Sequence, residues 1–331
     1  MSSLKISALS NYPKIGDTFE EQLLRRALTQ FDKKEIDLAQ LERAKDEVTR
    51  TVLKEQLEAG LEIVTDGQIR WDDPVTYLVR KIKGFTVTGM LRYFDTNTFY
   101  RQPVCEAELE APEELAVRDF QYANTMGSVP VKALMTGPYT MAKLSQNRFY
   151  DNLEQFAGRL AAILGEETKR LVRTGATLIQ FDEPALLNFK KEFSLFKKIW
   201  NRLASHFPEG VEIILSLNYG NLKGIYPEIQ ELSFTTLAFD YATAVENRRV
   251  LKGAPCTKKL LAGVIDSRNT RMETEGEIEG RLEELLQVVP AEDLAVTTNY
   301  GLEFLPRENA RKKITHLAKV ARGFREARVK A

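Results

Sequence analysis

Short apolar runs alternate with amphipathic stretches along most of this chain. The runs are rich in Val, Ile, Leu and Phe and end in turn residues, which is typical of strands buried on both faces of a parallel sheet. In the stretches between them, apolar residues recur every three or four positions, which predicts helices with one buried face. The predicted strands are Ile6–Ser10, Glu62–Asp66, Val131–Thr136, Thr177–Asp182, Glu212–Asn218, Thr236–Tyr241, Leu260–Asp266 and Leu294–Asn299. The predicted helices include Leu38–Ala59, Leu153–Arg173, Glu192–His206, Glu277–Val289 and Pro306–Ala327.

A regular alternation of strand and helix predicts an α/β fold, and eight such strands predict closure as a (β/α)8 TIM barrel. An open doubly wound sheet is the alternative. It usually has fewer strands, and no glycine-rich dinucleotide motif follows any predicted strand here.

The stretch Phe85–Glu110 does not fit the alternation, because it has strand-like periodicity and no helical stripe. We interpret residues 85–110 as a β-hairpin inserted between strands 2 and 3 of one barrel that spans residues 1–331. The hairpin either covers the functional site or only decorates the barrel.

Composition excludes several classes of protein. Hydrophobic residues make up 43% of the 331 residues, which is enough for a large core, and 47 basic residues balance 47 acidic ones, so nucleic acid is not an expected partner. No apolar run is long enough to span a membrane, and Met1–Lys5 is too polar to begin a signal peptide. Cys105 and Cys256 provide no disulfide framework, so we expect a cytoplasmic protein. The chain adds only His206 and His316 as further soft metal ligands.

The stretch Thr177–Leu186 carries the clearest candidate site. Asp182 and Glu183 stand where this buried strand must end, because Pro184 has no N–H to offer a sheet. The pair either caps the helix that follows or binds a ligand. Polar residues also follow the other predicted strands, and these ends meet at one face of a barrel. They are Ser10, Asn11, Asp66, Gln68, Thr136, Tyr139, Ser216, Asn218, Asp240, Asp266, Arg268, Asn299 and Tyr300.

Carboxylates dominate these strand ends, with few basic partners. Such a cluster suits a cationic amine, a pterin-like ring that donates N–H bonds, or a hard metal ion. Asp182, Glu183 and Asp240 are our candidates for catalytic groups. Arg70 and Arg268 either bind a substrate carboxylate or form salt bridges to the cluster.

Five segments together resemble cobalamin-independent methionine synthase. The similarity runs over nearly the whole chain and in the same order. The family's full-length members contain two related (β/α)8 barrels, whereas this chain is one barrel long. The segments are SALSNYPKIG at Ser7–Gly16, FDTNTFYRQP at Phe94–Pro103, TGPYT at Thr136–Thr140, IQFDEPAL at Ile179–Leu186 and LAGVIDSRN at Leu261–Asn269.

The resemblance also allows the family's zinc ligands to be compared with the matching positions of this chain. The family's C-terminal barrel holds zinc through His-x-Cys after strand five, Glu after strand six and Cys after strand eight, and the zinc binds homocysteine as a thiolate. The matching positions here are Ser216 and Asn218, Asp240 and Tyr300. The chain therefore looks closest to the family's zinc-free N-terminal barrel, and we expect no zinc and assign no metal ligand. A hard cation such as magnesium among Asp182, Asp240 and Asp266 stays an open alternative.

The resemblance also suggests substrate contacts. Asp182 matches an aspartate that contacts substrate, and Asn11 matches a serine near the homocysteine carboxylate. Gln68 replaces a glutamate that binds the substrate amine, and its neutral amide cannot supply that charge. Further candidates for substrate binding are Asn218, Asp266, Arg268 and Tyr300.

In the family, the N-terminal barrel helps to hold the polyglutamate tail of the folate, and this role needs basic side chains near the site. Ordinary solvated surface charge is the alternative interpretation for each of them. The candidates for cofactor binding are Lys14, Arg92, Arg101, Lys143 and Tyr139.

The resemblance implies a methyl-transfer protein of one-carbon and methionine metabolism. Its expected methyl donor is 5-methyltetrahydrofolate or a related methylpterin, and its expected partner is a separate zinc-bearing catalytic barrel. A stand-alone methyltransferase is the first alternative, with another acceptor or a donor supplied by a corrinoid protein. A non-catalytic partner subunit is the second. A decarboxylase of the uroporphyrinogen type ranks last, because its arginine-rich N-terminal motif is absent.

Overall fold

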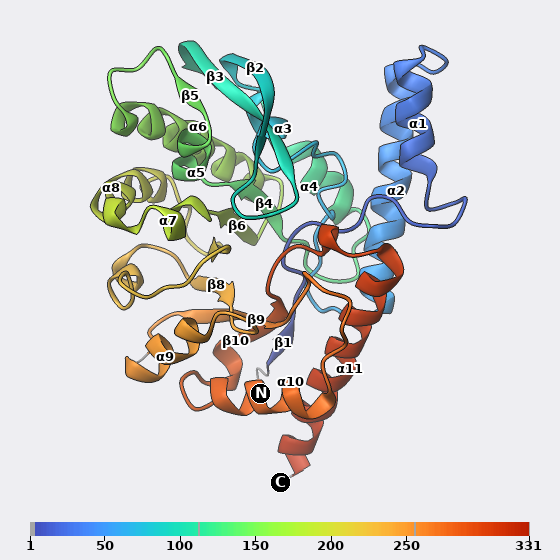
Figure 1. The fold of residues 1–331 in the computed structure, drawn as a ribbon, viewed down its shortest axis with the longest axis vertical. Helices are drawn as coiled ribbons and strands as arrows, with labels where there is room; N and C mark the ends of the chain where they lie inside the picture. The colour runs from blue at the N-terminus through green and yellow to red at the C-terminus, as the bar shows by residue number, and fades with distance from the viewer. Residues whose placement is uncertain (1–3, 112, 255, 331) are drawn as a thin grey trace.

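The computed structural model describes residues 4–111, 113–254 and 256–330. In this part of the chain seven strands form one parallel sheet, in the order β1-β10-β9-β8-β7-β6-β4, with helices around its outside (Figure 1). The predicted α/β class with a parallel sheet is confirmed. The strands are β1 (Lys5–Ile6), β4 (Ala133–Thr136), β6 (Leu178–Asp182), β7 (Glu212–Leu217), β8 (Thr236–Asp240), β9 (Lys259–Ile265) and β10 (Leu294–Thr298).

The predicted strand Glu62–Asp66 is wrong in its extent. It forms only two isolated parallel bridges, from Ile63 to Ser7 beside β1 and from Val64 to Val131 beside β4. The ladder stops there because the Gln56 side chain takes both backbone groups of Thr65, at 3.0 Å and 2.9 Å. Since β1 and β4 are the two edges of the sheet, these bridges bring the curled sheet back on itself.

Helices lie between successive strands and begin at side-chain caps where the sequence provides them. Asp37 and Gln40 form a capping box at the start of α2, and the Asn152 side chain accepts from the Gln155 N–H at the start of α6. The predicted helix Leu153–Arg173 has the observed bounds of α6. The α-helices are α1 (Leu23–Asp32), α2 (Leu38–Glu58), α3 (Thr76–Val79), α4 (Val117–Asn124), α5 (Pro138–Lys143), α6 (Leu153–Arg173), α7 (Ala185–Asn188), α8 (Phe193–Ala204), α9 (Val245–Gly253), α10 (Glu275–Leu285) and α11 (Arg307–Lys330). The 3-10 helices are η1 (Lys190–Glu192), η2 (Glu228–Glu231), η3 (Ala291–Asp293) and η4 (Leu302–Phe304).

A second, smaller sheet stands apart from the parallel one. β2 (Lys83–Arg92) and β3 (Phe99–Glu110) pair as an antiparallel hairpin, and the short β5 (Gln146–Asn147) adds to β3. In Figure 1 the hairpin lies in the upper part of the view, while α10 and the C-terminal part of α11 lie at the bottom. It lies in the chain between the bridging segment at Val64 and strand β4.

Packing outside the sheet decides which strand residues face inward. On β6, Phe181 contacts Trp200 of α8, with ring centroids 6.0 Å apart, and Phe196 stacks on the same tryptophan at 5.9 Å. Because side chains alternate along a strand, Gln180 and Asp182 point to the opposite face, inside the curled sheet. No helix in the described part of the chain is long and apolar enough to cross a membrane.

Candidate functional site

Asp182 lies at the C-terminal end of β6 and is half-buried. Gln180, two residues earlier on the same face, donates its Nε2 to Asp182 Oδ1 at 2.7 Å. Burial raises the pKa of Asp182, and the hydrogen bonds from Gln180 and Ser216 and the charge of Lys132 only partly oppose this. The carboxyl group can therefore hold a proton more readily than an exposed aspartate.

The adjacent residue, Glu183, has a different role. Its two oxygens accept the backbone N–H groups of Tyr139 at 3.0 Å and Thr140 at 2.7 Å, in the first turn of α5. Burial raises its pKa to about 7. A Cβ on Gly137 would lie 2.2 Å from the Glu183 carboxyl carbon, so that position needs glycine. Glu183 thus caps a helix, but the helix is α5, which follows the neighbouring strand β4, and not α7, which follows β6.

Glu303, in η4 just after β10, joins Asp182 at the site and is absent from the residues predicted from the sequence. Its Oε1 accepts from Asn11 Nδ2 at 3.1 Å, and its Oε2 has no hydrogen-bond partner among the described residues. Burial raises its pKa to about 7. The backbone N–H of Glu303 itself, the charge of Lys14 and the hydrogen bond from Asn11 oppose this, and the charge of Asp182 reinforces it. A Cβ on Gly301 would lie 2.0 Å from Oε2. The glycine two residues before Glu303 was therefore the one feature of the sequence that could have pointed to this glutamate.

Lys14 faces this carboxylate from the loop after β1. Its Nζ donates to the Trp71 carbonyl. Burial lowers its pKa, and Glu303 is the strongest of the charges that oppose the change. The side chain therefore points into the molecule, and a contact with a folate tail at the surface stays a prediction.

Four aromatic rings near the strand ends contact one another. Tyr93 and Phe94 come from the turn of the hairpin, and Tyr219 and Tyr300 follow β7 and β10. Tyr219 stacks on Tyr300 at 4.8 Å and on Phe94 at 5.9 Å, and meets Tyr93 edge-on at 5.7 Å. Burial raises the pKa of both Tyr93 and Tyr219, and the charges of Asp182 and Glu303 add to it in each case. The charges of Asp182 and Glu303 thus raise the pKa of the same two tyrosines, Tyr93 and Tyr219.

Arg268, after β9, fastens the hairpin turn to these loops. Its Nη2 donates to the carbonyl of Asp95 at 3.1 Å, and its guanidinium lies 5.3 Å from the centre of the Tyr300 ring. The same arginine donates its backbone N–H to Asp266 Oδ1 at 2.9 Å. We call this whole assembly the mouth: Asn11, Lys14, Tyr93, Phe94, Gln180, Asp182, Tyr219, Arg268, Tyr300 and Glu303.

The positions that correspond to zinc ligands include Tyr300 of the mouth, and they form hydrogen bonds to one another in pairs. Asp240 accepts from the Thr243 N–H at 2.9 Å, from the Thr243 hydroxyl and from Tyr300 Oη at 3.3 Å. The Asn218 amide lies 3.3 Å from Ser216 Oγ. Asp266 and Asn299 form a similar pair at 3.3 Å. These contacts hold neighbouring loops together with hydroxyl, amide and carboxylate groups.

Sulfur and imidazole groups lie away from these positions. Cys105 is within β3 and His316 within α11, while Cys256 and His206 precede β9 and β7 and so lie toward the opposite end of the sheet. Among the described residues, no group of three or more His, Cys, Asp or Glu is placed to hold a metal ion. The donors at the zinc-equivalent positions are all oxygens or amides, which do not suit a metal that must activate a thiol.

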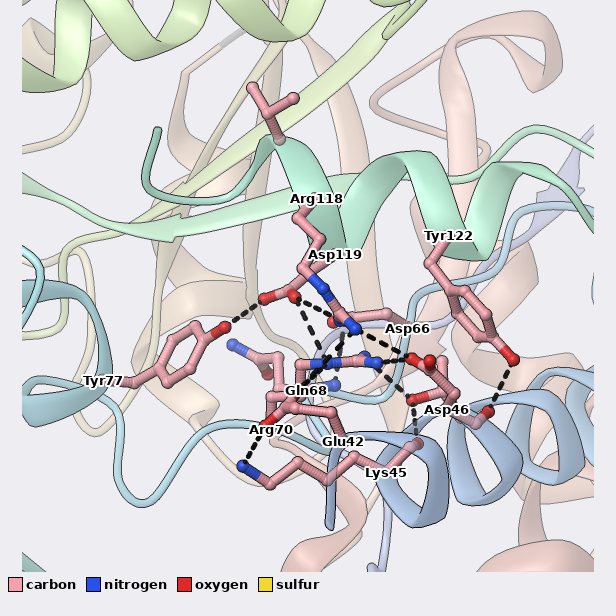
Figure 2. Close-up of polar contacts among 12 residues, drawn as sticks. Glu42, Lys45, Asp46, Asp66, Gln68, Arg70, Tyr77, Arg118, Asp119 and Tyr122 are labelled. Atoms are coloured by element: carbon pink, nitrogen blue, oxygen red, sulfur yellow. Dashed lines mark hydrogen bonds and ion pairs between the residues drawn. The ribbon is translucent and has the colours of Figure 1, made fainter. Parts of the chain in front are cut away.

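Asp66, Gln68 and Arg70 belong to a second cluster, drawn in Figure 2. Arg70 is buried and pairs with Asp46 of α2 and, at 3.5 Å, with Asp119 of α4. Burial, and then the charge of Asp119, raises the pKa of Asp66 to about 7. Gln68 is 2% exposed, with φ at 51°. Of the two interpretations of Arg70, the structure supports the salt bridge.

The predicted cofactor residues other than Lys14 do not gather at the mouth. Arg92 bonds within its own hairpin turn, to the Thr96 carbonyl at 2.5 Å, and Arg101 is exposed on β3. Lys143 pairs with Glu192 at 3.0 Å on the outside of the sheet. The Tyr139 hydroxyl donates to the same Glu192 at 2.8 Å, and its ring packs between α5 and α8.

Comparison with known proteins identifies the family. Residues 13–323 match the model of the cobalamin-independent synthase, catalytic domain. The chain belongs to this family. Curated methionine synthases from Saccharolobus solfataricus and Sulfurisphaera tokodaii are 28% and 29% identical to it, covering 98% of this chain and 95% and 93% of their own. The resemblance to cobalamin-independent methionine synthase is therefore confirmed.

Solved structures show the same fold. A B12-independent methionine synthase from Shewanella sp. W3-18-1, in complex with selenomethionine, superposes with a TM-score of 0.84 at 22% identity, covering 99% of this chain and 100% of that one. A protein described as the putative vitamin-B12 independent methionine synthase from Listeria monocytogenes gives 0.77 at 17% identity, covering 96% and 98%. The fold is TIM-barrel-like. Since the matched family model describes the catalytic domain, a closer likeness to the zinc-free N-terminal barrel stays a prediction.

Proposed function

We propose that this protein takes part in methyl transfer in methionine metabolism and binds its small-molecule substrates at the mouth. The observation that supports this is that Asp182 and Glu303 lie near enough to Tyr93 and Tyr219 for their charges to raise the pKa of both tyrosines. Carboxyl groups recognise N–H donors, and stacked rings suit a planar or apolar ligand. Membership of the family supplies the class of reaction.

The proposed methyl donor is 5-methyltetrahydrofolate or a related methylpterin. Its ring system would enter beside the hairpin turn, where Tyr93 and Phe94 present aromatic faces. Arg92 and Arg101 stand on the same hairpin and are available to the carboxylates of a folate tail. We further propose that residues 1–331 form one barrel, with the eighth strand at the bridging segment and the hairpin as its insertion.

Thiol activation is the part of the reaction that this chain does not provide. A thiol attacks a methyl group as the thiolate, which zinc stabilises through soft ligands. Ser216, Asn218, Asp240 and Tyr300 offer no such ligand, so we propose that no zinc binds here. A separate zinc-bearing catalytic barrel would then supply the activated thiol.

A stand-alone methyltransferase is the second candidate, with an acceptor that needs no zinc or with a donor delivered by a corrinoid protein. The raised pKa of Asp182 and of Glu303 favours it, because such carboxyl groups can take up the proton that an acceptor loses. The curated relatives, which are matched over 95% and 93% of their length, are also about one barrel long.

Methyl transfer from 5-methyltetrahydrofolate to homocysteine tests both candidates. We would assay this protein alone, a zinc-bearing catalytic barrel alone, and the two together, and measure bound metal in each sample. Activity that appears or rises only in the mixture supports the partner model. Activity of the isolated protein without zinc, abolished in Asp182→Asn, supports the stand-alone enzyme. No effect in any arm, with a competent partner, contradicts the partner model, and the assay is then repeated with other methyl donors and acceptors. A non-catalytic subunit follows only if these also give no activity.

A further inference from the structure

Lys132 is a buried lysine inside the curled sheet, directly before β4. Its side chain is 1% exposed, and its Nζ donates to the Ala8 carbonyl at 2.8 Å. Since the bridging segment (residues 62–66) lies between β1 and β4, the lysine side chain crosses the inner face of that segment to reach Ala8. Ser7 Oγ also donates to this carbonyl at 2.8 Å. In the described chain, the ammonium group has no ion pair and no second acceptor, so two of its three N–H donors are unused.

This lysine does little to stabilise the fold. An ammonium group that is buried without an ion pair costs free energy. Burial lowers the pKa of Lys132 to about 7, and the charges of Asp182 and Glu212 only partly oppose this. Glu212 has partners of its own, Lys259 at 3.2 Å and the Thr236 hydroxyl at 2.7 Å. Asp182 forms no ion pair with any described residue, so it is the carboxylate that the charge of Lys132 is left to serve.

The register of β4 and β6 places Gln180 between Lys132 and Asp182. Leu134 pairs with Gln180 and Thr136 pairs with Asp182, and Lys132 comes two residues before Leu134 on the same inner face. Gln180 Nε2 donates to Asp182 Oδ1 at 2.7 Å, while its buried Oε1 has no partner among the described residues. The lysine thus has donors to spare on one side of an amide that has an acceptor to spare, and the aspartate lies on the other side.

We propose that Lys132 is a positioning residue for Asp182 and acts through the Gln180 amide. A positive charge on the side of Lys132 favours the orientation in which Oε1 faces the lysine and Nε2 faces Asp182. An N–H donor that faces a carboxyl group favours its ionised form. Without the lysine charge the amide would be free to turn over, and its oxygen would then accept from a protonated Asp182. This inference rests on the proposed function, because it takes Asp182 as a group that acts on the substrate.

The other titratable groups near Asp182 do not favour its ionised form. The two glutamates disfavour a second negative charge when they are ionised, and the two tyrosines stay protonated because burial raises their pKa. Ser216 contributes a hydrogen bond, and Lys132 is the cation whose charge opposes the effect of burial on the pKa of Asp182. The four groups are Glu183, Glu303, Tyr93 and Tyr219.

NMR titration of the aspartate carboxyl carbons, in metal-free buffer and without substrate, tests the proposal. Asp182→Asn identifies the signal of Asp182. In Lys132→Met the titration midpoint of Asp182 should move to higher pH, because the amide loses the charge that orients it. Gln180→Met should also raise the midpoint, because the donor itself is lost. Adding Lys132→Met to Gln180→Met should then cause a clearly smaller further shift. Equal shifts in the two backgrounds would show that the lysine acts without the amide, and would overturn the inference.

Lys313 provides the matched control, because it is also a buried lysine but has an ion pair. It is 0% exposed, and its Nζ lies 3.0 Å from Glu273 Oε2. Lys313→Met should lower the stability in urea unfolding, since Glu273 loses its cation, and should leave the titration of Asp182 unchanged. Lys132→Met should move that titration without lowering stability.

Two results for Lys132→Met would overturn the inference. One is an unchanged midpoint of Asp182. The other is a variant that does not fold, because the lysine would then be a structural group. The expected titration together with no methyl transfer in any assay would instead contradict the proposed function and leave the positioning role intact.

Discussion

The Arg70 cluster and the mouth are both rich in buried carboxylates, and they differ in how those carboxylates are paired. In the Arg70 cluster the charges of α2 and α4 meet Arg70, and Tyr77 Oη donates to Asp119 Oδ2 at 2.6 Å (Figure 2). In the mouth, the open oxygen of Glu303 faces no donor from the described chain. The first arrangement joins elements together through ion pairs, although Gln68 Oε1 in it also lacks a partner, whereas the second leaves a carboxylate oxygen open.

The comparison shows why a perturbed pKa alone does not mark a functional residue. Burial raises the pKa of Asp66, Glu183 and Glu303 alike to about 7. Yet Glu183 has both oxygens occupied by N–H groups of α5, while Glu303 has one oxygen free. Desolvation sets the direction of the pKa, and the hydrogen-bond partners decide whether the group is structural.

Removing the cation of the Arg70 cluster should have the largest effect on stability. Arg70→Met leaves buried carboxylates without their partner, so we expect the free energy of unfolding to fall by about 3–5 kcal/mol. The measurement is urea unfolding followed by circular dichroism. Arg118→Met is the control, because its side chain is 41% exposed against 3% for Arg70, and its loss should cost about 1 kcal/mol or less. Equal losses in the two variants would show that the cluster is not a buried network.

Replacing Glu183 and Glu303 separately should show which of the two stabilises the fold. Glu183→Gln keeps one acceptor for the two N–H groups of α5, so stability should fall by about 1–3 kcal/mol in urea unfolding. Glu303→Gln should not lower stability, because the open oxygen has no donor to lose. A large destabilisation by Glu303→Gln would mean that this residue, too, is structural.

The pH dependence of stability should separate Glu303→Gln from wild type in a defined direction. The pKa of Glu303 in the folded protein, about 7, lies above its ordinary value, so the folded state binds the proton more tightly than the unfolded one. Its contribution to stability is complete below about pH 4.5 and is lost as the pH rises through about 7. Relative to wild type, Glu303→Gln should therefore gain about 3 kcal/mol between these limits. A difference that stays constant with pH would contradict the raised pKa.

Loosening the hairpin should have the smallest effect. Arg268→Ala removes the bond to the Asp95 carbonyl, and we expect global stability to change by about 1 kcal/mol or less. Amide hydrogen exchange in the turn between β2 and β3 should become faster, because a docked turn is released. Lys83→Ala, at the exposed far end of the hairpin, is the control. Unchanged exchange in Arg268→Ala would show that the aromatic contacts alone hold the turn.

Much of the fold could be predicted from local pattern. Apolar runs and helical stripes located the strands of the parallel sheet and α6, because burial on two faces or on one face leaves a periodic signal. The segment Glu62–Asp66 has the same pattern but not the same ladder. The Gln56 side chain, from the preceding helix, binds the backbone N–H and carbonyl of Thr65. The periodicity of the sequence gives no sign of this contact.

The site could be predicted only in part. Asp182 was recognisable because its strand must end before Pro184, and it reaches the mouth. Glu183 and Arg70 are also charged residues that follow predicted strands. Yet Glu183 binds N–H groups of α5, and Arg70 pairs with carboxylates of α2 and α4. Local sequence tells where a charged residue stands in an element and not what the neighbouring element presents to it.

The amino-acid sequence by itself determined the α/β class, the family motifs and the polar character of the strand ends. Only the tertiary structure decided which of those polar groups meet. Asn11 and Glu303 are separated by 292 residues and lie in hydrogen-bond contact, because the curled sheet brings β1 next to β10. The open oxygen of Glu303 is a property of that contact, since a partner is present or absent only after the chain has folded.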